Sequence, residues 1–466
     1  MNSLLNPFIG IPLLIEYATA PTRLHRFSDE RLQRYKDNAF KKVVKYAYEV
    51  PVYHNKYKKA GIKPYDIQGI KDIQKLPFVT KKDMIENFPD NITPLGYKKE
   101  NAYVASTSGS SGKPVSVYLD FYTISRGTAL FLRQAKTYNF NWLKDKHAII
   151  GTYDEGRVDR VVEDAYISKT HFIRSSDKNL NLNAYAPIKE IVDKLNAFEP
   201  DLLISYPITL QHIAYFKKKG YCDKLNPKIL QSGGYSLDEY TKRYIEDAFN
   251  TRVVNLYQTV EACTDIAFEC FEGTWHINHD YHHLEAVDEN MEIVANGERG
   301  HVVETRLFGR GTPFVRYTGM DDWITLVDDY DCSCGLHTPI LKNGVEGRVS
   351  ARILLPDGRV YPAASFAIIS LVLKDLKTFK VTQFQIIQKK IDLIEVLLVI
   401  DNDLRDTGPS VDQIFKKIKD SYEKLVGPDV KIVVKEVKEL KSTPGKPSPT
   451  VISHVKLEDG FKILED

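Results

Sequence analysis

The sequence contains little cysteine and no long uninterrupted hydrophobic run. Its 466 residues include 5 cysteines, an odd number in a long chain, which argues against the disulfide framework of a secreted protein. Residues 4–18 are apolar, but Pro7 and Pro12 interrupt them and no basic residue precedes them. We therefore expect no signal peptide and no transmembrane segment, and a cytoplasmic location. We expect this segment to be buried against the protein, with a docking arm or a membrane-touching segment as the alternative.

An excess of either charge is also missing. The 64 Lys and Arg residues nearly balance the 62 Asp and Glu residues, and the net charge is +2. This balance gives no global electrostatic reason to expect binding to nucleic acid. A hydrophobic share of 43% and a charged share of 27% are those of an ordinary globular protein. At this length two or more domains are expected.

Helical and strand patterns alternate through the middle of the chain. Such alternation predicts βα units and a largely parallel sheet, in which ligands bind at the carboxyl ends of strands. The loops after Leu203, Leu230 and Leu256 are therefore candidate sites. We expect helices over residues 120–138, 188–198 and 238–249, and strands over 148–152, 202–207, 228–231 and 252–256.

The two ends of the chain show different patterns. Residues 28–62 have helical spacing, with Ser28 as a candidate N-cap and a helix end before Pro51, and Thr80 is a second candidate N-cap. From residue 285 the pattern becomes β-rich, and 344–348 is a candidate linker. The expected fold is α/β: a large N-terminal domain, residues 1–347, with largely parallel sheets and a β-rich subdomain, then a small α+β C-terminal domain, residues 348–466. In the latter we expect strands within 379–400, a helix over 411–425 and a strand over 431–437.

A Ser/Gly loop between two β-leaning runs is the most informative motif. Its glycines permit tight backbone geometry, its hydroxyls and amides offer donors to one anion, and its lysine adds a positive charge. These features predict a phosphate-binding hairpin, with a solvated turn or linker as the alternative. It is not the common P-loop, which needs glycine at its first position and Ser or Thr at its last. The loop comprises Thr107, Ser108, Gly109, Ser110, Ser111, Gly112, Lys113 and Pro114.

Three further stretches could meet this loop. Residues 232–235 (Ser-Gly-Gly-Tyr) leave a strand with bare backbone that a flat ring could approach. Residues 257–261 (Tyr-Gln-Thr-Val-Glu) offer an aromatic face and, in Glu261, a carboxylate able to hold Mg²⁺ near phosphates. Residues 316–321 end in Asp321, which could accept hydrogen bonds from ribose hydroxyls. Each stretch taken alone is more typical of a loop than of a site.

The order of these motifs resembles that of the adenylate-forming (acyl-AMP) ligase superfamily. The succession is T-S-G-S-S-G-K-P, Y-x-x-x-E, R-Y-x-x-x-D, G-R and a late P-G-K. The chain is most similar to phenylacetate–CoA ligases and related proteins of capsule gene clusters, including its residues 46–83. The resemblance implies ATP-dependent activation of a carboxylic acid as an acyl-adenylate, then transfer to coenzyme A by an AMP-forming acid–thiol ligase. It also implies a mobile C-terminal domain.

The resemblance also implies a role for each motif residue. Thr107 to Lys113 would hold the β- and γ-phosphates, and Glu261 would ligate Mg²⁺. Lys446 would reach the α-phosphate and the carboxylate during adenylation. The implied adenine-binding residues are Gly233, Gly234, Tyr235 and Tyr257, with Gln258 and Thr259 beside them, and the implied ribose-binding residues are Asp321 and Arg348.

Several positions depart from the family pattern. Gln258 and Val260 stand where glycine and threonine are usual, although Thr259 could replace the missing hydroxyl by a small shift. Thr318 and Gly319 are displaced by one position, Ser350 replaces a hinge aspartate, and no arginine follows Lys446. These departures keep two alternatives open. One is stand-alone adenylation, or transfer to an amine or carrier protein in a pathway such as capsule synthesis. The other is a catalytically weakened nucleotide-binding scaffold.

The acyl pocket should lie among the loops at residues 152–153, 206–207, 234–235 and 263–264, whose aromatics suggest an aryl or compact acid or are simply core tyrosines. The identity of the acid and the oligomeric state stay open, with a homodimer as one option.

Three cysteines and one histidine form a candidate zinc site. His276 follows Cys270 by six residues, and Cys332 and Cys334 form a later C-x-C-G. Three thiols and one imidazole suit tetrahedral Zn²⁺, with buried free cysteines as the alternative. The arrangement is similar to one in relatives of the same branch, which implies a structural role. The rival ligands are His279, His282, His283 and His337, and Cys222 and Cys263 are expected to be ordinary residues.

Overall fold

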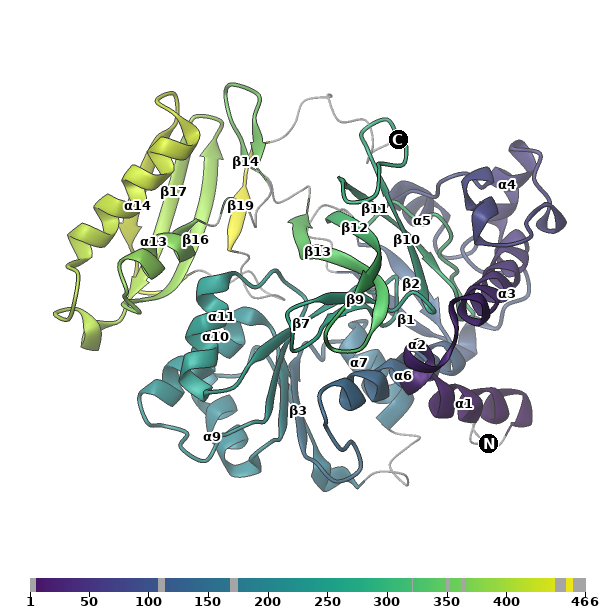
Figure 1. The fold of residues 1–466 in the computed structure, drawn as a ribbon, viewed down its shortest axis with the longest axis horizontal. Coiled ribbons are helices and arrows are strands. Elements are labelled where there is room, and N and C mark those ends of the chain that lie inside the picture. The colour runs from purple at the N-terminus through teal and green to yellow at the C-terminus, as the bar shows by residue number, and fades with distance from the viewer. Residues whose placement is uncertain are drawn as a thin grey trace.

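The structure is a computed structural model that describes residues 6–107, 114–167, 175–320, 322–348, 353–361, 366, 368–440 and 450–455. Within these residues the chain forms a large body around an 11-stranded sheet and a small C-terminal body around a 4-stranded sheet. Figure 1 shows the small body on the left, beside the helices α10 and α11 of the large body. The expected α/β architecture is confirmed.

One half of the large sheet is parallel, as the alternating pattern predicts. β3 and β5–β7 pack their apolar side chains against the buried faces of α9–α11, and α6 packs against another hydrophobic cluster formed with β5–β8. The elements of this half are α6 (Phe121–Thr137), β3 (His147–Gly151), α7 (Val158–Val162), β4 (Asn179–Asn183), α9 (Ile188–Phe198), β5 (Leu202–Ser205), α10 (Pro207–Lys218), β6 (Ile229–Ser232), α11 (Glu239–Phe249) and β7 (Val253–Gln258). Each element that the sequence predicts here is found within two residues of its expected ends.

The other half of the sheet is antiparallel and begins where β8 pairs with β7. Its strands are β8 (Asp265–Glu269), β9 (Trp275–Ile277), β10 (His282–Val287), β11 (Arg299–Arg306), β12 (Asp322–Asp331) and β13 (His337–Arg348). The linker predicted at residues 344–348 is wrong, because these residues belong to β13. Gly344 has φ +75°, and a Cβ atom there would lie 2.8 Å from the Trp275 ring. The glycine therefore serves close packing within an irregular strand pair and does not mark a domain break.

The N-terminal helices pack on the large body. Ser28 and Thr80 are N-caps as predicted, and Thr80 forms a reciprocal capping box with Asp83. The elements are α1 (Pro7–Thr19), α2 (Arg23–Arg26), α3 (Asp29–Tyr48), α4 (Pro51–Lys59) and α5 (Lys81–Asn87), followed by the hairpin strands β1 (Tyr103–Ser106) and β2 (Ser116–Leu119). Because Pro51 starts α4, the helical segment breaks where the sequence predicts.

The small body is an α+β unit with its own core. Ser410 caps its long amphipathic helix α14, whose Ile418 and Tyr422 are buried against the sheet. Its elements are β14 (Ile353–Leu354), β15 (Val360–Tyr361), α13 (Ile369–Asp375), β16 (Val381–Lys390), β17 (Leu393–Ile400), α14 (Val411–Val426), β18 (Lys431–Glu436) and β19 (Val451–Ser453). The predicted strands and helix are confirmed, and the domain boundary at residues 347/348 stays a prediction.

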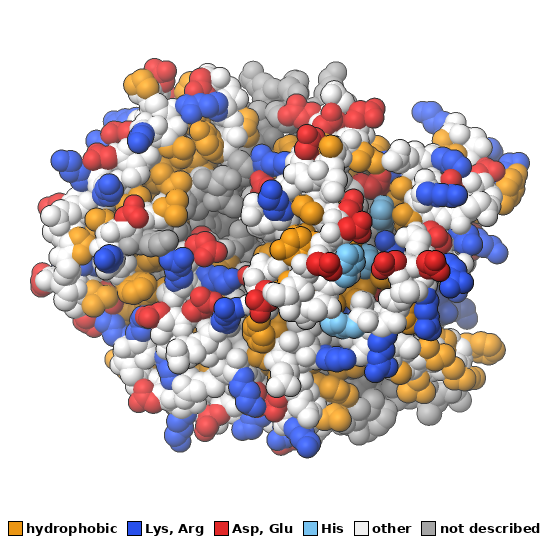
Figure 2. Space-filling view, viewed as in Figure 1, with side chains coloured by type: hydrophobic (Ala, Val, Ile, Leu, Met, Phe, Trp, Pro, Cys, Tyr) orange, Lys and Arg blue, Asp and Glu red, His pale blue; other side chains and the backbone are white. Residues whose placement is uncertain are grey.

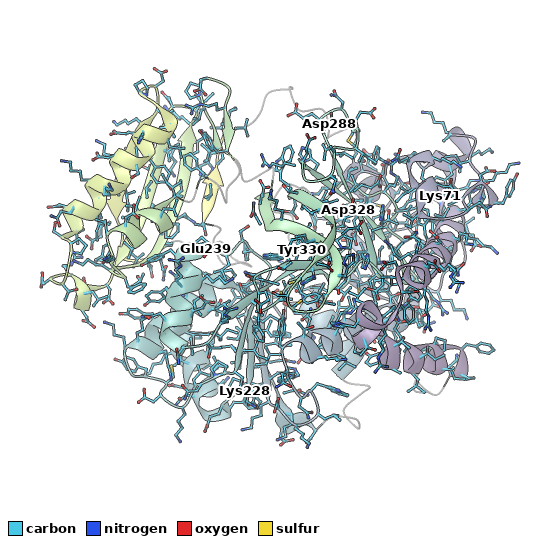
Figure 3. The ribbon with its side chains drawn as sticks, in the orientation of Figure 1. Lys71, Lys228, Glu239, Asp288, Asp328 and Tyr330 are labelled. Carbon is cyan, nitrogen blue, oxygen red and sulfur yellow. The ribbon has the colours of Figure 1, made fainter. Side chains whose placement is uncertain are left out.

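Side chains of α10 and α11 hold the small body in its observed position. Tyr240 donates a hydrogen bond to the Val381 carbonyl at 3.0 Å, and Lys219 pairs with Asp401 at 3.2 Å and also with Asp403. Glu239, labelled in Figure 3, marks the end of α11 that faces the small body. The contact is therefore polar and aromatic, and it also includes Tyr244 in the middle of α11, whose ring packs on Phe379.

Helix α1 is attached by a buried ion network and presents an apolar outer face. Arg23 contacts Glu16 at 2.7 Å and Asp280 at 2.8 Å, so the inner side of α1 is fixed. The outer side is exposed, and hydrophobic side chains gather there at the lower right of Figure 2. The burial expected for this segment is thus correct for one face only. The exposed side chains are Phe8, Ile11, Leu14 and Ile15.

A bilayer-spanning helix is not found in the part of the chain that the structure describes.

Replacing Asp280 should destabilise the large body strongly. Arg133 donates to both carboxylate oxygens of Asp280 at 2.9 and 2.7 Å, and Arg23 donates to one of them. Burial alone would raise the pKa of Asp280, but these guanidinium groups hold it well below its usual range. The carboxylate thus stabilises the fold at neutral pH, and this contribution is lost as the pH falls through the folded pKa. Asp280→Asn should lower the free energy of unfolding at pH 7 by about 3–5 kcal/mol, measured by urea denaturation.

Asp90→Asn is the matched control, because Asp90 forms an exposed ion pair with Lys99. It should change the free energy of unfolding by about 1 kcal/mol or less. Equal changes in the two variants would show that the buried network does not stabilise the fold.

Candidate functional site

Two predicted loops leave neighbouring strands at the carboxyl edge of the parallel half-sheet. Residues 232–235 follow β6, and residues 257–261 span the end of β7, its parallel neighbour. Gly234 has φ +79°, and a Cβ atom there would lie 2.9 Å from Cε1 of Tyr206. The bare backbone predicted at this position therefore lets the Tyr206 ring pack directly on the loop. The Tyr235 ring meets Tyr206 edge-on, with centroids 5.8 Å apart.

A half-buried aspartate that sequence reasoning missed contacts Tyr206. Asp159 of α7 accepts hydrogen bonds from the Thr152 amide at 2.8 Å and from the Tyr206 hydroxyl at 3.5 Å. Burial raises the pKa of Asp159. The loops at Thr152 and Tyr206, both predicted to border the acyl pocket, are thus joined through one carboxylate. A polar residue within a short helix carries no sequence signal for this contact.

A residue predicted to lie near the adenine and a strand position predicted to hold the ribose meet at Asp322. The Tyr257 hydroxyl donates to Asp322 Oδ2 at 2.8 Å. In the antiparallel pair of β12 and β13, the backbone of Asp322 lies opposite that of Arg348. Asp321 itself lies outside the described residues, as does the side chain of Arg348. Tyr257 and the backbone of Arg348 therefore meet next to Asp321, although they are far apart in the sequence. Asp322 was missed because Asp321 occupies the motif position.

Glu261 is buried at the end of its loop. It is 5% exposed, and the Tyr317 hydroxyl lies 3.4 Å from its carboxylate. Arg306 donates to the Glu261 carbonyl at 2.8 Å, which fixes the backbone there. Arg316, the first residue of the R-Y motif, instead forms an ion pair with Glu285 at 2.8 Å. Arg316 therefore has a structural role, while Tyr317 contacts Glu261, the predicted magnesium ligand.

The β1–β2 hairpin carries the Ser/Gly loop. Thr107 and Val115 close the hairpin with two hydrogen bonds of 2.9 Å, and Ser106 donates to the Gly156 carbonyl at 2.9 Å. The inner face of the hairpin shares one hydrophobic core with residues 257–263. The predicted phosphate-binding residues Ser108, Gly109, Ser110, Ser111, Gly112 and Lys113 and the predicted catalytic Lys446 lie outside the described residues.

Gln258, one of the departures from the family pattern, is exposed and is hydrogen-bonded to a chain of buried polar side chains. Its side chain donates to Asp265, which also accepts from Gln134. The Gln134 oxygen in turn accepts from Gln231 at 2.8 Å. Burial raises the pKa of Asp265 to about 6. The chain links α6, β6, β7 and β8 below the two loops.

The predicted zinc ligands come together. The ligand atoms of Cys270, His276, Cys332 and Cys334 all lie within 4.8 Å of one another. Cys270 Sγ and Cys332 Sγ are 3.8 Å apart, and Cys334 Sγ is 3.3 Å from His276 Nε2. Four ligands on a tetrahedron with Zn–S bonds of about 2.3 Å would have sulfur atoms about 3.8 Å apart. The donor set and spacing therefore fit a tetrahedral metal ion.

The surroundings of His276 suit metal binding. Burial lowers the pKa of His276 to about 4, so the imidazole is neutral at pH 7, the form that binds metal. Its Nδ1 lies 2.8 Å from Thr338 Oγ1, an outer contact that leaves Nε2 facing Cys334. A surface hollow of about 320 Å³ is lined in part by Cys270.

The rival ligands lie elsewhere. His337 pairs with Asp331, and His282 pairs with Glu304, while His279 and His283 are not in the cluster found among the described residues. Cys222 is buried in the core of the parallel half. Burial raises the pKa of Cys263 to about 11, so its thiol is not a thiolate at neutral pH.

The sequence matches no family model. The phenylacetate-coenzyme A ligase of Thermus thermophilus is 23% identical over 354 residues, which cover 73% of this chain and 75% of that protein. Protein CapK of Staphylococcus aureus is 26% identical over 408 residues, covering 85% and 84%. The predicted resemblance to adenylate-forming ligases of the phenylacetate–CoA ligase type is confirmed by these similarities.

Solved structures share the fold. A crystal structure of 2-hydroxyisobutyryl-CoA ligase in the postadenylation state, in complex with 2-HIB-AMP, matches 93% of this chain and 91% of its own, with a TM-score of 0.77 at 18% identity. The same ligase in the thioesterification state gives 0.62, and its open form with CoA gives 0.60. The large and small bodies of this chain are thus arranged most like the first of these three forms.

Replacing Tyr257 by phenylalanine should remove a buried hydrogen bond to Asp322. We expect the free energy of unfolding to fall by about 1–3 kcal/mol, measured by urea denaturation at pH 7. Tyr330→Phe is the matched control, because Tyr330 is 40% exposed on β12. The control should change it by about 0.5 kcal/mol or less. Equal stability of Tyr257→Phe and the wild type would refute the importance of this hydrogen bond.

Proposed function

We propose that this protein activates a carboxylic acid with ATP as an acyl-adenylate and transfers the acyl group to coenzyme A. The observation that carries the proposal is the convergence of the β6 loop, the β7 loop and the Asp322–Arg348 strand pair at one edge of the sheet. The fold shared with an acyl-AMP-binding CoA ligase and the curated relatives named as CoA ligases support it.

The proposed roles follow the positions of the loops. Residues 107–113 hold the β- and γ-phosphates, and Glu261 ligates Mg²⁺ beside them, because carboxylate oxygen is the ligand that Mg²⁺ prefers. Asp321 and Arg348 hold the ribose. The adenine lies against Gly233, Gly234, Tyr235 and Tyr257.

The chemistry requires little from the protein beyond positioning and charge. A carboxylate is ionised at neutral pH and needs no general base. Its oxygen forms a bond to the α-phosphorus while the bond to pyrophosphate breaks, and Lys446 neutralises the charge that develops there. The thiol sulfur of coenzyme A then bonds to the acyl carbon, its proton is lost to solvent, and AMP leaves.

Features of the sequence support two alternatives to transfer to coenzyme A. Both transfer to an amine or a carrier protein and a weakened nucleotide-binding scaffold are motivated by the departures from the family pattern, such as Gln258 and Val260. The relatives named as CoA ligases favour coenzyme A as the acceptor. A domain boundary at residues 347/348, a cytoplasmic location and a homodimer belong to the same proposal.

The cysteine and histidine cluster holds a structural zinc ion in this proposal. Cys270 and His276 belong to the β8–β9 segment, and Cys332 and Cys334 belong to the turn between β12 and β13. An ion there would fasten this turn to the strands that lead from β7. Since four protein ligands fill a tetrahedral site, zinc would have no open position for catalysis.

Lys446→Ala tests adenylation. Pyrophosphate release is first measured for the wild type across a panel of aryl, aliphatic and hydroxylated acids, and acyl-CoA is identified by mass spectrometry. With the best acid, the variant should lose about 100-fold or more in adenylation rate, because the neutralising charge is gone. ATP binding, measured by calorimetry, should stay within a few-fold of the wild type.

Lys441→Ala, a change in the same segment, should leave the rate unchanged and serves as the control. Unchanged adenylation in Lys446→Ala would remove the role of that lysine. Binding of ATP without acid-dependent pyrophosphate release would favour the scaffold, and release without acyl-CoA would favour another acceptor.

Cys334→Ser tests the zinc site. Protein purified without chelator should contain about one zinc ion per chain by elemental analysis, and the variant should have lost most of it. Cys222→Ser, a buried cysteine outside the cluster, should keep the metal. A wild-type protein free of zinc would disprove the site.

A further inference from the structure

The end of β7 carries a side chain where the family pattern has none. Gln258 is exposed, and its Oε1 lies 3.7 Å from the position that a Cβ atom on Gly233 would take. The carboxamide thus borders the loop that follows β6. Any ligand group resting on Gly233 from this side meets Gln258.

The buried amide chain fixes which end of the carboxamide faces the ligand. Gln258 Nε2 donates to one oxygen of Asp265, and Gln134 donates to the other. Turning the Gln258 carboxamide over would place its oxygen against a carboxylate oxygen, two acceptors with no proton between them. The Gln258 oxygen is therefore the end that stays available to a ligand.

Buried side chains beneath Gln258 support this orientation of its carboxamide. Gln134 cannot easily turn either, because its own oxygen accepts from Gln231 at 2.8 Å. Asp265, Gln134 and Gln231 are at most 6% exposed, so water does not replace these contacts readily. Gln231 thus donates to Gln134, which donates to Asp265, and Asp265 accepts from Gln258.

We propose that Gln258 is a specificity-determining residue whose Oε1 accepts a hydrogen bond from an N–H or O–H group of the bound ligand. The ligand's identity rests on the proposed function. The donor is either the exocyclic amino group of adenine or a hydroxyl or amino group on the acid. A ligand that offers an acceptor here would face a fixed acceptor, which disfavours it.

The test compares ligands that differ only in this donor. Calorimetry measures binding of ATP and of inosine triphosphate, whose purine carries an oxygen where adenine has its amino group. Pyrophosphate release measures kcat/KM for two acid pairs, 4-hydroxyphenylacetate with phenylacetate and 2-hydroxyisobutyrate with isobutyrate. The wild type should prefer the donor-bearing member in at least one of the three pairs.

Gln258→Met keeps the length of the side chain but removes the acceptor. It should reduce that preference about 3- to 10-fold, the value of one ordinary hydrogen bond. Asp265→Asn keeps Gln258 but lets its carboxamide turn over, since asparagine offers both a donor and an acceptor. It should reduce the same preference, and a purely structural role would weaken both members of the pair equally.

The outcomes separate this inference from the proposed function. A preference seen only between the nucleotides identifies adenine as the donor, and one seen only between acids identifies the acid. No preference in the wild type, or ratios unchanged within about twofold in Gln258→Met, overturns the inference. Absence of pyrophosphate release with every acid refutes the proposed function, while the ATP-to-inosine-triphosphate ratio still decides the role of Gln258 in nucleotide selection. Failure to bind either nucleotide refutes both.

Discussion

The candidate site depends on one strand, β7, that pairs in parallel with β6 and antiparallel with β8. The parallel pairing brings its final residues beside the Gly233–Tyr235 loop. The antiparallel pairing returns the chain at once, so that Asp265 lies opposite Gln258. Tyr257, on the other face of the strand, reaches Asp322. Substitutions at the end of β7 would therefore affect contacts with α6, β6, β8 and β12.

Much of the parallel half could be predicted from the sequence, because its helices and strands alternate and each has a clear apolar face. The meeting of Cys270, His276, Cys332 and Cys334 could also be predicted, because three thiols and one imidazole suit a tetrahedral ion and relatives have a similar arrangement. The β13 segment could not, because Gly344 looks like a break and instead makes room for Trp275. Asp322 and Asp159 were missed for a different reason: their partners are far away in the sequence, and a lone aspartate reveals nothing of its partner.

The buried polar residues have two different roles. Asp280 is surrounded by the guanidinium groups of Arg23 and Arg133, which hold its charge and tie α1 to the sheet. Asp265 receives neutral amides, and its pKa is raised to about 6. The negative charge of Asp280 is neutralised by two guanidinium groups, so its role is mainly structural. The negative charge of Asp265 is not neutralised by its neutral amide partners, so it still acts on polar groups nearby. The contrast separates the anchor of the N-terminal helix from the polar floor of the site.

The contact between the two bodies includes the pairs of Lys219 with Asp401 and Asp403 and the hydrogen bond from the Tyr240 hydroxyl to Val381. Rotation of the small body would have to separate these groups and then restore them in every cycle. Asp401 and Tyr240 are buried, and Phe379 packs on the rings of Tyr240 and Tyr244, so separation would expose a carboxylate and aromatic surface to water. The position seen here is thus held largely by groups shielded from water, and dissolved salt would weaken mainly the exposed pair between Lys219 and Asp403.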